Sequence, residues 1–241
     1  MKTSLDKFLG GKIKIFQPLK GYRGGIDAVL LASFVNVYKN SKILDLGSGT
    51  GLISFCLAYR CSNIKITGIE KNSYYHSLSL KSVQLNKLKS KINFVKNDLK
   101  NINKPIFDFI ISNPPWFEKN STYKSDHFLI NEARIESLSL DVWIKKVNQN
   151  LKTKGSYYTI FPYKRISKLV DVLNHYFNSI EIYPISSFLD TEPNKAIIFA
   201  KKSDQNSRIR EFGRIIIHKN DKTFMENINN VLSKGMPFTF A

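Results

Sequence analysis

A glycine-rich loop between an apolar strand and an apolar helix is the feature that most constrains the fold of this chain. Residues 41–51 read SKILDLGSGTG, and the apolar residues 52–59 follow at once. This succession is typical of the first unit of a doubly wound α/β sheet, where glycines let a ligand approach the backbone. Asp45 lies just before the loop, and its carboxylate would repel a pyrophosphate but attract a cationic, amino-acid-like group. The loop therefore predicts a nucleotide-type site that includes Asp45, Gly47, Gly49 and Gly51.

Two further predicted strands also end in acidic residues. Residues 64–69 lead into Glu70, and residues 92–96 lead into Asn97 and Asp98. Glu70 follows the glycine loop by about twenty residues, the spacing at which an acidic side chain meets ribose hydroxyls in doubly wound folds. The Asp98 carboxylate can accept from an adenine amino group. Three acidic strand ends in succession are a more specific signal than any one of them, and they predict one shared cofactor site.

The tetrapeptide Asn113-Pro114-Pro115-Trp116 follows the apolar run 107–112, which reads as a buried parallel strand. Ligands of open α/β sheets bind beyond the carboxyl ends of the strands. Two consecutive prolines hold the chain in a rigid extended path there. The Asn113 side-chain oxygen and the Pro114 carbonyl can then accept from one exocyclic amino group, while the Trp116 indole stacks on the attached ring. The motif predicts a binding site for a planar amine.

The remaining pattern alternates between strands and helices and indicates one α/β domain. Asp27 is expected to N-cap a helix over 28–35, and Tyr22 and Arg23 in the glycine-flanked turn 21–27 to cover a cofactor carboxylate or RNA. We predict strands at 13–17, 156–161 and 180–185, helices at 73–86, 138–151, 163–177 and 224–232, and late antiparallel strands at 195–201 and 214–218. The predicted single domain comprises an amino-terminal cover and first helix (1–40), a ligand-binding core (41–202) and a carboxy-terminal strand and helix (203–241).

The formal net charge of +18 favours a polyanionic partner. Only seven of the 37 basic residues are arginine, however, and an AT-rich genome would by itself produce such a lysine-rich chain. Charge alone also leaves RNA, DNA and an acidic protein open. Arg208, Arg210 and Arg214 cluster near the late strands and are the candidate RNA contacts.

Other features favour a protein of the reducing cytoplasm with no membrane segment and no metal. The chain has no apolar run of the roughly 18 residues that a membrane span needs, and its start lacks the apolar region of a signal peptide. Cys56 and Cys61 are expected to be free thiols. The polar stretch 117–134 is predicted to be a functional flap, and a catalytic role for its His127 is the less favoured reading.

Taken in order, the glycine loop, the acidic strand ends and Asn-Pro-Pro-Trp resemble the class I S-adenosylmethionine-dependent methyltransferases that methylate amino groups. Residues 21–32, 113–117 and 133–140 look like those of the bacterial tRNA adenine-N6 methyltransferases that modify the adenosine beside the anticodon of a valine tRNA. The resemblance implies a Rossmann-like sheet of seven strands, mostly parallel with a reversed last hairpin. It also implies S-adenosylmethionine as donor and adenine N6 as acceptor. Trp116, where Tyr or Phe is commoner, and Gly24-Gly25, where a bulkier residue is often found, depart from the pattern.

The site residues follow from the motifs and the resemblance together. The catalytic set is Asn113, Pro114, Pro115 and Trp116. The cofactor-binding set is Tyr22, Arg23, Asp45, Gly47, Gly49, Gly51, Glu70, Asp98 and Asn113. The expected partner is tRNA, bound by a monomer. Alternatives are a guanine-N2 methyltransferase of rRNA, a protein glutamine N5-methyltransferase, which the positive charge and the absence of a separate amino-terminal recognition domain disfavour, and a non-enzymatic RNA-binding module, which the intact Asn113 disfavours.

Overall fold

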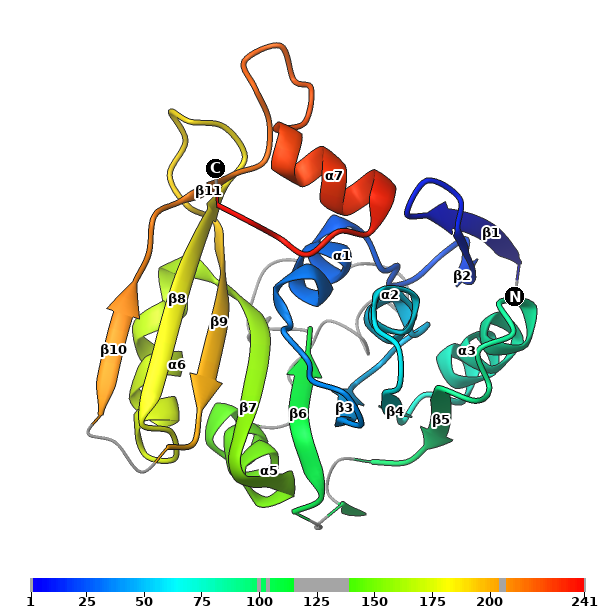
Figure 1. Cartoon of the computed structure of the whole chain (residues 1–241), viewed down its shortest axis with the longest axis horizontal. Helices are drawn as coiled ribbons and strands as arrows, with labels where there is room; N and C mark the ends of the chain where they lie inside the picture. The colour runs from blue at the N-terminus through cyan, green and yellow to red at the C-terminus, as the bar shows by residue number, and fades with distance from the viewer. Residues whose placement is uncertain (1, 99–100, 103–104, 115–138, 204–206, 241) are drawn as a thin grey trace.

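The computed structural model describes residues 2–98, 101–102, 105–114, 139–203 and 207–240. A nine-stranded sheet forms the centre, with helices on both faces and a separate two-stranded hairpin at one side (Figure 1). The α/β class predicted from the alternating pattern and the mostly parallel sheet implied by the resemblance are confirmed.

The sheet has the order β10-β8-β9-β7-β6-β3-β4-β5, and β11 pairs with β8. Strand β9 is antiparallel to both of its neighbours, β7 and β8, and the other pairs are parallel. The chain proceeds from β3 to β4 and β5 on one side and then returns to β6 on the other, so β3 and β6 flank the switch point where doubly wound sheets bind ligands. The strands are β3 (Lys42–Leu46), β4 (Lys65–Glu70), β5 (Ile92–Lys96), β6 (Phe107–Ser112), β7 (Leu151–Pro162), β8 (Ser179–Ser186), β9 (Lys195–Lys201), β10 (Arg208–Glu211) and β11 (Ile215–Ile216).

Two hydrophobic clusters cover the two faces of the sheet, because successive strand residues point to opposite faces. Ile43 belongs to one cluster and Leu44 to the other. The first face packs against α1 (Ile26–Phe34), α2 (Leu52–Arg60), α3 (Ser73–Leu85) and α7 (Glu226–Lys234). The second packs against α5 (Leu140–Asn150) and α6 (Ile166–Asn174), which the short 3-10 helix η2 (Tyr163–Arg165) precedes.

The amino-terminal segment forms an antiparallel hairpin, β1 (Thr3–Phe8) and β2 (Ile13–Pro18). It docks along α3 through the free edge of β2. Phe16 N donates to Ser82 Oγ at 3.0 Å, Lys14 N donates to Asn86 Oδ1 at 3.1 Å, and Asn86 Nδ2 donates to the Lys14 carbonyl at 2.6 Å. The predicted brief strand at 13–17 therefore exists, and its partner strand fixes it to the body.

Two expectations about the late strands are wrong. The described residues alone form nine strands of the sheet rather than seven, and the region 214–218 contributes β11, which is parallel to β8 and not antiparallel. The reason lies in the register, since Lys201 at the end of β9 lies opposite Ser179 at the start of β8. Strand β10 begins at that same end, with Arg208 opposite Ser179, so it can only run in the direction of β8.

Asp27 does not N-cap the first helix, contrary to expectation. Gly25 occupies the N-cap position and makes no side-chain cap hydrogen bond. Asp27 lies in the first turn and forms an ion pair with Lys195 at the start of β9. A carboxylate in the first turn is still favourable for the helix dipole.

Within the described ranges, no helix is long and apolar enough to cross a membrane. The same residues contain no group of three or more His, Cys, Asp or Glu side chains that could hold a metal ion.

Candidate active site

The glycine loop after β3 has a backbone that only glycine adopts without strain. Gly47, Gly49 and Gly51 have φ angles of 72°, 56° and 89°, in the left-handed region that disfavours side chains. A Cβ on Gly51 would also lie 2.3 Å from the Phe94 ring. Gly47 N and Ser48 N both donate to the Ile69 carbonyl at 2.9 Å, which holds the loop against the end of β4.

Asp45 presents a buried carboxyl group beneath this loop. Its side chain is 1% exposed, and Oδ2 accepts from Ser54 Oγ at 2.6 Å and Ser54 N at 3.2 Å. Oδ1 has no hydrogen-bond partner within the described part of the chain, and neither does the buried Ser48 Oγ. Burial raises the pKa of Asp45 to about 6, with the Glu70 charge adding and the Ser54 hydrogen bonds opposing. A buried oxygen without a donor is costly, so the site is prepared for a donor on a ligand.

Glu70 at the end of β4 supports the glycine loop directly. Oε2 accepts from Gly49 N at 2.9 Å and Oε1 accepts from Asn72 N at 2.8 Å. Burial raises the pKa of this carboxyl group above its usual value. A carboxylate has about four acceptor sites in all, so Glu70 can still accept from a ligand. Asp98 follows the adjacent strand β5, where Asn97 N donates to the Glu70 carbonyl at 3.1 Å. The acidic strand ends thus lie side by side, as the topology requires.

Asn113 follows β6 on the other side of the switch point and is joined to the amino-terminal segment. Its Nδ2 donates to Tyr22 Oη at 3.3 Å, and Tyr22 N donates to Tyr75 Oη at 2.8 Å. A Cβ built on Gly49 would lie 3.9 Å from the Tyr22 ring. Burial, followed by the Asp27 and Asp45 charges, raises the pKa of Tyr22 well above its usual value, so its phenol is neutral. Tyr22 therefore bridges the glycine loop and the Asn-Pro motif.

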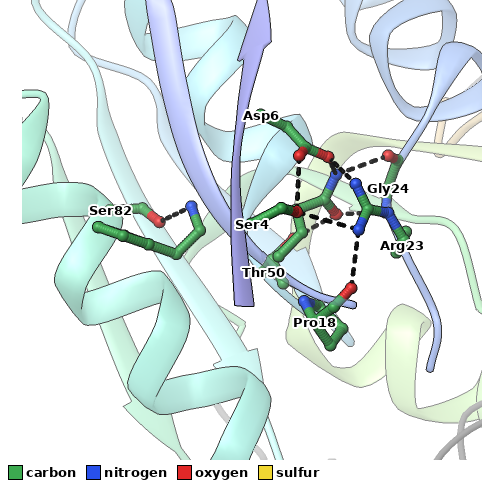
Figure 2. A network of polar contacts seen from close by, with 9 residues as sticks. Ser4, Asp6, Pro18, Arg23, Gly24, Thr50 and Ser82 are labelled. Carbon is green, nitrogen blue, oxygen red and sulfur yellow. Dashed lines mark hydrogen bonds and ion pairs between the residues drawn. The ribbon is translucent and has the colours of Figure 1, made fainter. Parts of the chain in front are cut away.

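Arg23, predicted to cover a cofactor carboxylate or RNA, contacts the amino-terminal hairpin. Its guanidinium group forms an ion pair with Asp6 and donates to Ser4 Oγ at 3.0 Å and to the Pro18 carbonyl at 2.9 Å (Figure 2). All three partners belong to the hairpin. Arg23 thus ties the Tyr22 segment to β1 and β2.

Gln17 completes this network and was not singled out from the sequence. It is 1% exposed. Its Nε2 donates to Asp6 Oδ2 at 2.8 Å and to the Gly24 carbonyl at 3.1 Å, and its Oε1 accepts from Gly24 N at 2.8 Å and Thr50 Oγ1 at 3.3 Å. Figure 2 shows how the network joins the hairpin to Gly24 and to Thr50 of the glycine loop. Its position in the sequence could have indicated its burial, because Gln17 alternates with Ile13 and Ile15 on the same, buried face of β2.

A second polar group supports the loop from the opposite face of the sheet. Ser112 Oγ and Tyr157 Oη are 2.6 Å apart, and Trp143 Nε1 donates to Tyr157 Oη at 3.3 Å. The Trp143 ring would lie 3.7 Å from a Cβ on Gly47. None of these three side chains was predicted to bear on the site. Serine and tyrosine inside apolar strand runs give no local indication of their partners.

Pro114 is buried directly after Asn113. Pro115, Trp116 and the stretch 117–134 with His127 lie outside the described residues, so their expected roles stay predictions.

Solved structures share this fold. A predicted O-methyltransferase from Agrobacterium tumefaciens matches with a TM-score of 0.73 over 88% of this chain and 98% of that one, at 18% identity. TYW2 from M. jannaschii, solved in complex with AdoMet, matches with a TM-score of 0.59 over 83% of this chain and 85% of that one, at 16% identity. The free Asp45 and Ser48 oxygens and the side-chain-free glycine cradle fit a ligand of that kind. This fold and site, together with a match to the methyltransferase small domain, define a class I S-adenosylmethionine-dependent methyltransferase.

The sequence comparisons are more specific. The model of the methyltransferase small domain matches residues 24–183. A tRNA1(Val) (adenine(37)-N6)-methyltransferase from a Flavobacteriaceae bacterium (strain 3519-10) is 31% identical, over 63% of this chain and 64% of that protein. Its namesake from Glaesserella parasuis is 30% identical, over 71% and 73%. The chain belongs to the methyltransferase small domain family and, within it, to the group of these tRNA1(Val) (adenine(37)-N6)-methyltransferases.

Proposed function

We propose that the protein methylates N6 of an adenosine in tRNA with S-adenosylmethionine as donor. The proposed target is adenosine 37 of tRNA1(Val), the position that the names of the relatives state for those proteins. The observation that carries the proposal is the position of Asn113-Pro114 at the end of β6, joined through Tyr22 to the glycine loop.

In this proposal the acidic strand ends hold the cofactor. Asp45 Oδ1, which has no donor among the described residues, accepts from the cationic amino group. Glu70 accepts from the ribose hydroxyls and Asp98 from the adenine amino group. Gly47, Gly49 and Gly51 leave room for the ligand at the backbone. When bound, S-adenosylmethionine supplies an electrophilic methyl group on a sulfonium.

Asn113 and Pro114 act on the acceptor amine. The lone pair of an aromatic amine is delocalised into its ring, so attack requires the nitrogen to move toward tetrahedral geometry. Asn113 Oδ1 and the Pro114 carbonyl accept from the two N–H bonds and favour that change. This is catalysis by positioning and by preorganised dipoles, and it needs no strong base.

Trp116, with Pro115 holding it, is proposed to stack on the flipped adenine. Each stacked base contributes roughly 1–3 kcal/mol, which offsets part of the cost of unstacking. Tyr22 is proposed to orient Asn113. Arg23 is assigned a supporting role, since its guanidinium group binds the hairpin.

The proposal includes a single domain over residues 1–241, acting as a monomer in the cytoplasm. Methylation of rRNA guanine N2 or of a protein glutamine by the same Asn-Pro motif is the competing function, and a non-enzymatic RNA-binding module is a third.

One experiment separates these functions. The protein is incubated with methyl-labelled S-adenosylmethionine and, separately, unmodified tRNA, ribosomes and a release factor, and labelled RNA is digested to nucleosides. N6-methyladenosine from tRNA alone is the expected product. Label in N2-methylguanosine or in protein would replace the proposal with the corresponding alternative, and no label in any substrate would favour the binding module.

A further inference from the structure

The outer face of the β1–β2 hairpin carries two lysines in direct opposition. Lys7 lies opposite Lys14 in the antiparallel register, and both are exposed. Ile13, Ile15 and Gln17, on the other face of β2, are buried. Like charges placed directly opposite each other destabilise a strand pair. The arrangement therefore costs stability in the free protein, which a binding partner of opposite charge would relieve.

The hairpin itself, residues 3–18, holds a single acidic residue. Asp6, the one acidic residue of the hairpin, faces inward to Arg23 and Gln17 (Figure 2). The hairpin docks on α3 (Figure 1), and residues 71–97, which contain α3, include six lysines and no Asp or Glu. Five of these lysines are exposed, namely Lys71, Lys81, Lys87, Lys89 and Lys96. An AT-rich genome would enrich lysine throughout the chain, but it does not explain why residues 71–97 lack Asp and Glu.

The hairpin face leads to the proposed active site. At the open end of the hairpin, Leu19 N donates to the Lys2 carbonyl at 3.1 Å, and Lys20 precedes Gly21 and Tyr22. Tyr22 contacts Asn113. From this end to Lys7 and Lys14 the strands extend about 15 Å, at roughly 3.3 Å per residue. The lysines of the face thus follow a line outward from the site.

The hairpin is also firmly attached. Gln17 links it to Gly24 and Thr50, and Ser82 and Asn86 of α3 hold the edge of β2. A ligand that binds the hairpin face is therefore held at a fixed position relative to Asn113.

We propose that the outer hairpin face with Lys7 and Lys14, together with Lys2 and Lys20 at the open end of the hairpin, binds the phosphate backbone of the tRNA beside the target adenosine. This inference rests on the proposed function. Lysines along an extended line suit successive phosphates, which they contact as point charges. An acidic protein partner would also need apolar side chains to contact. The exposed large apolar side chains of residues 2–20 are two isolated leucines, Leu5 and Leu19.

The test compares two variants of equal charge. Lys7→Gln/Lys14→Gln removes the opposed pair, and the control Lys39→Gln/Lys145→Gln removes two exposed lysines from the turn before β3 and from α5. Binding of unmodified tRNA is measured over a range of salt concentrations, together with S-adenosylhomocysteine affinity and melting temperature. Poly-L-glutamate is titrated in parallel as an acidic polypeptide.

We expect the hairpin variant to reduce the slope of log K against log salt by about 1.4–1.8, at roughly 0.7–0.9 per lost phosphate contact. Its tRNA affinity at low salt should fall at least tenfold. Cofactor-product affinity should not change, and the melting temperature should not fall, because a repulsion is removed. The control should shift the slope by less than half as much.

Several results would overturn the inference. One is tRNA binding by the hairpin variant equal to that of wild type or of the control. Another is poly-L-glutamate binding as tight as that of tRNA and equally sensitive to the variant, which would indicate a site for acidic polypeptides. If wild type methylates tRNA while the hairpin variant binds it normally, only the inference fails. If wild type methylates no tRNA, the proposed function itself fails.

Discussion

Asn113 donates from Nδ2 to the phenolic oxygen of Tyr22, 3.3 Å away, although the two residues are 91 positions apart in the sequence. An Asn side chain has one accepting oxygen and one donating nitrogen. With the nitrogen bound to Tyr22, the oxygen is left for the acceptor amine. The observed amide orientation is the one that the proposed reaction needs.

Replacing Tyr22 by Phe should lower kcat about three- to tenfold, because the orienting hydrogen bond contributes about 0.5–1.5 kcal/mol. Cofactor-product affinity and KM for tRNA should change less than twofold. Tyr38→Phe is the control, since Tyr38 donates to Asp108, outside the proposed site. Equal kcat in the Tyr22 variant and wild type would show that the Tyr22 hydroxyl does not contribute to the reaction.

Replacing Asn113 by Ala should lower turnover by about 10²–10³, the usual effect of losing one preorganised polar contact to a transition state. Calorimetry should show nearly unchanged binding of S-adenosylhomocysteine. Near-normal turnover at saturating cofactor and tRNA would refute the proposed grip on the amine.

Replacing Glu70 by Ala should weaken cofactor binding by about 1.5–3 kcal/mol, the contribution of a hydrogen bond to a charged group. The melting temperature should also fall, because Glu70 accepts from Gly49 N and Asn72 N. Glu70→Gln keeps one acceptor oxygen and should lie between Ala and wild type in both measurements. Unchanged affinity for S-adenosylhomocysteine in the Ala variant would remove Glu70 from the site.

Replacing Asp45 by Asn should stabilise the ligand-free protein at neutral pH. Burial raises the pKa of Asp45 from 3.8 to about 6, so the folded chain holds this proton more tightly than the unfolded chain. The contribution of Asp45 to stability is complete below about pH 4 and is lost as pH rises through about 6. The advantage of the variant in free energy of unfolding should therefore be absent near pH 4 and full above pH 7, on the order of 3 kcal/mol, and melting temperatures measured over this pH range test it.

Asp45→Asn should also weaken ligand binding, and this measurement is the control for the stability prediction. Affinity of wild type for S-adenosylhomocysteine should fall as pH drops below about 6, because the ionised carboxylate attracts the ligand's amino group. The Asn variant should bind weakly and with little pH dependence over that range. A wild-type affinity that stayed constant from pH 7 to pH 5 would contradict this role of Asp45.

Charge reversal at the late strands should weaken tRNA binding in a graded way. Arg208 begins β10 opposite the start of β8. Arg214 follows the carboxyl-terminal end of β10, on the same side of the sheet as the carboxyl-terminal end of β6, where Asn113 lies. Arg214→Glu should therefore reduce tRNA affinity more than Arg208→Glu, with Arg210→Glu between them. Binding assays at fixed salt test the order, and cofactor-product affinity should stay constant. The reverse order would place the RNA elsewhere.

The sequence alone determined the local architecture and the chemistry of individual strand ends. The run SKILDLGSGTG predicts strand, loop and helix because each depends on residues close together in the chain. Placing Asp45, Glu70, Asp98 and Asn113 at one edge required only that parallel strands share a direction. Ranges such as 92–96 and 107–112 agree with β5 and β6 residue for residue, since buried parallel strands are continuous apolar runs.

Only the tertiary structure decided which side chains meet. The contact of Tyr22 with Asn113, the ion pair of Arg23 with Asp6 and the buried hydrogen bonds of Gln17 join segments whose separation no periodicity encodes. The parallel direction of β10 and β11 likewise depends on the end of β8 at which the chain leaves β9. Polar partners are chosen by geometry after the core has packed, because a buried donor or acceptor must be satisfied by whatever group the fold brings within reach.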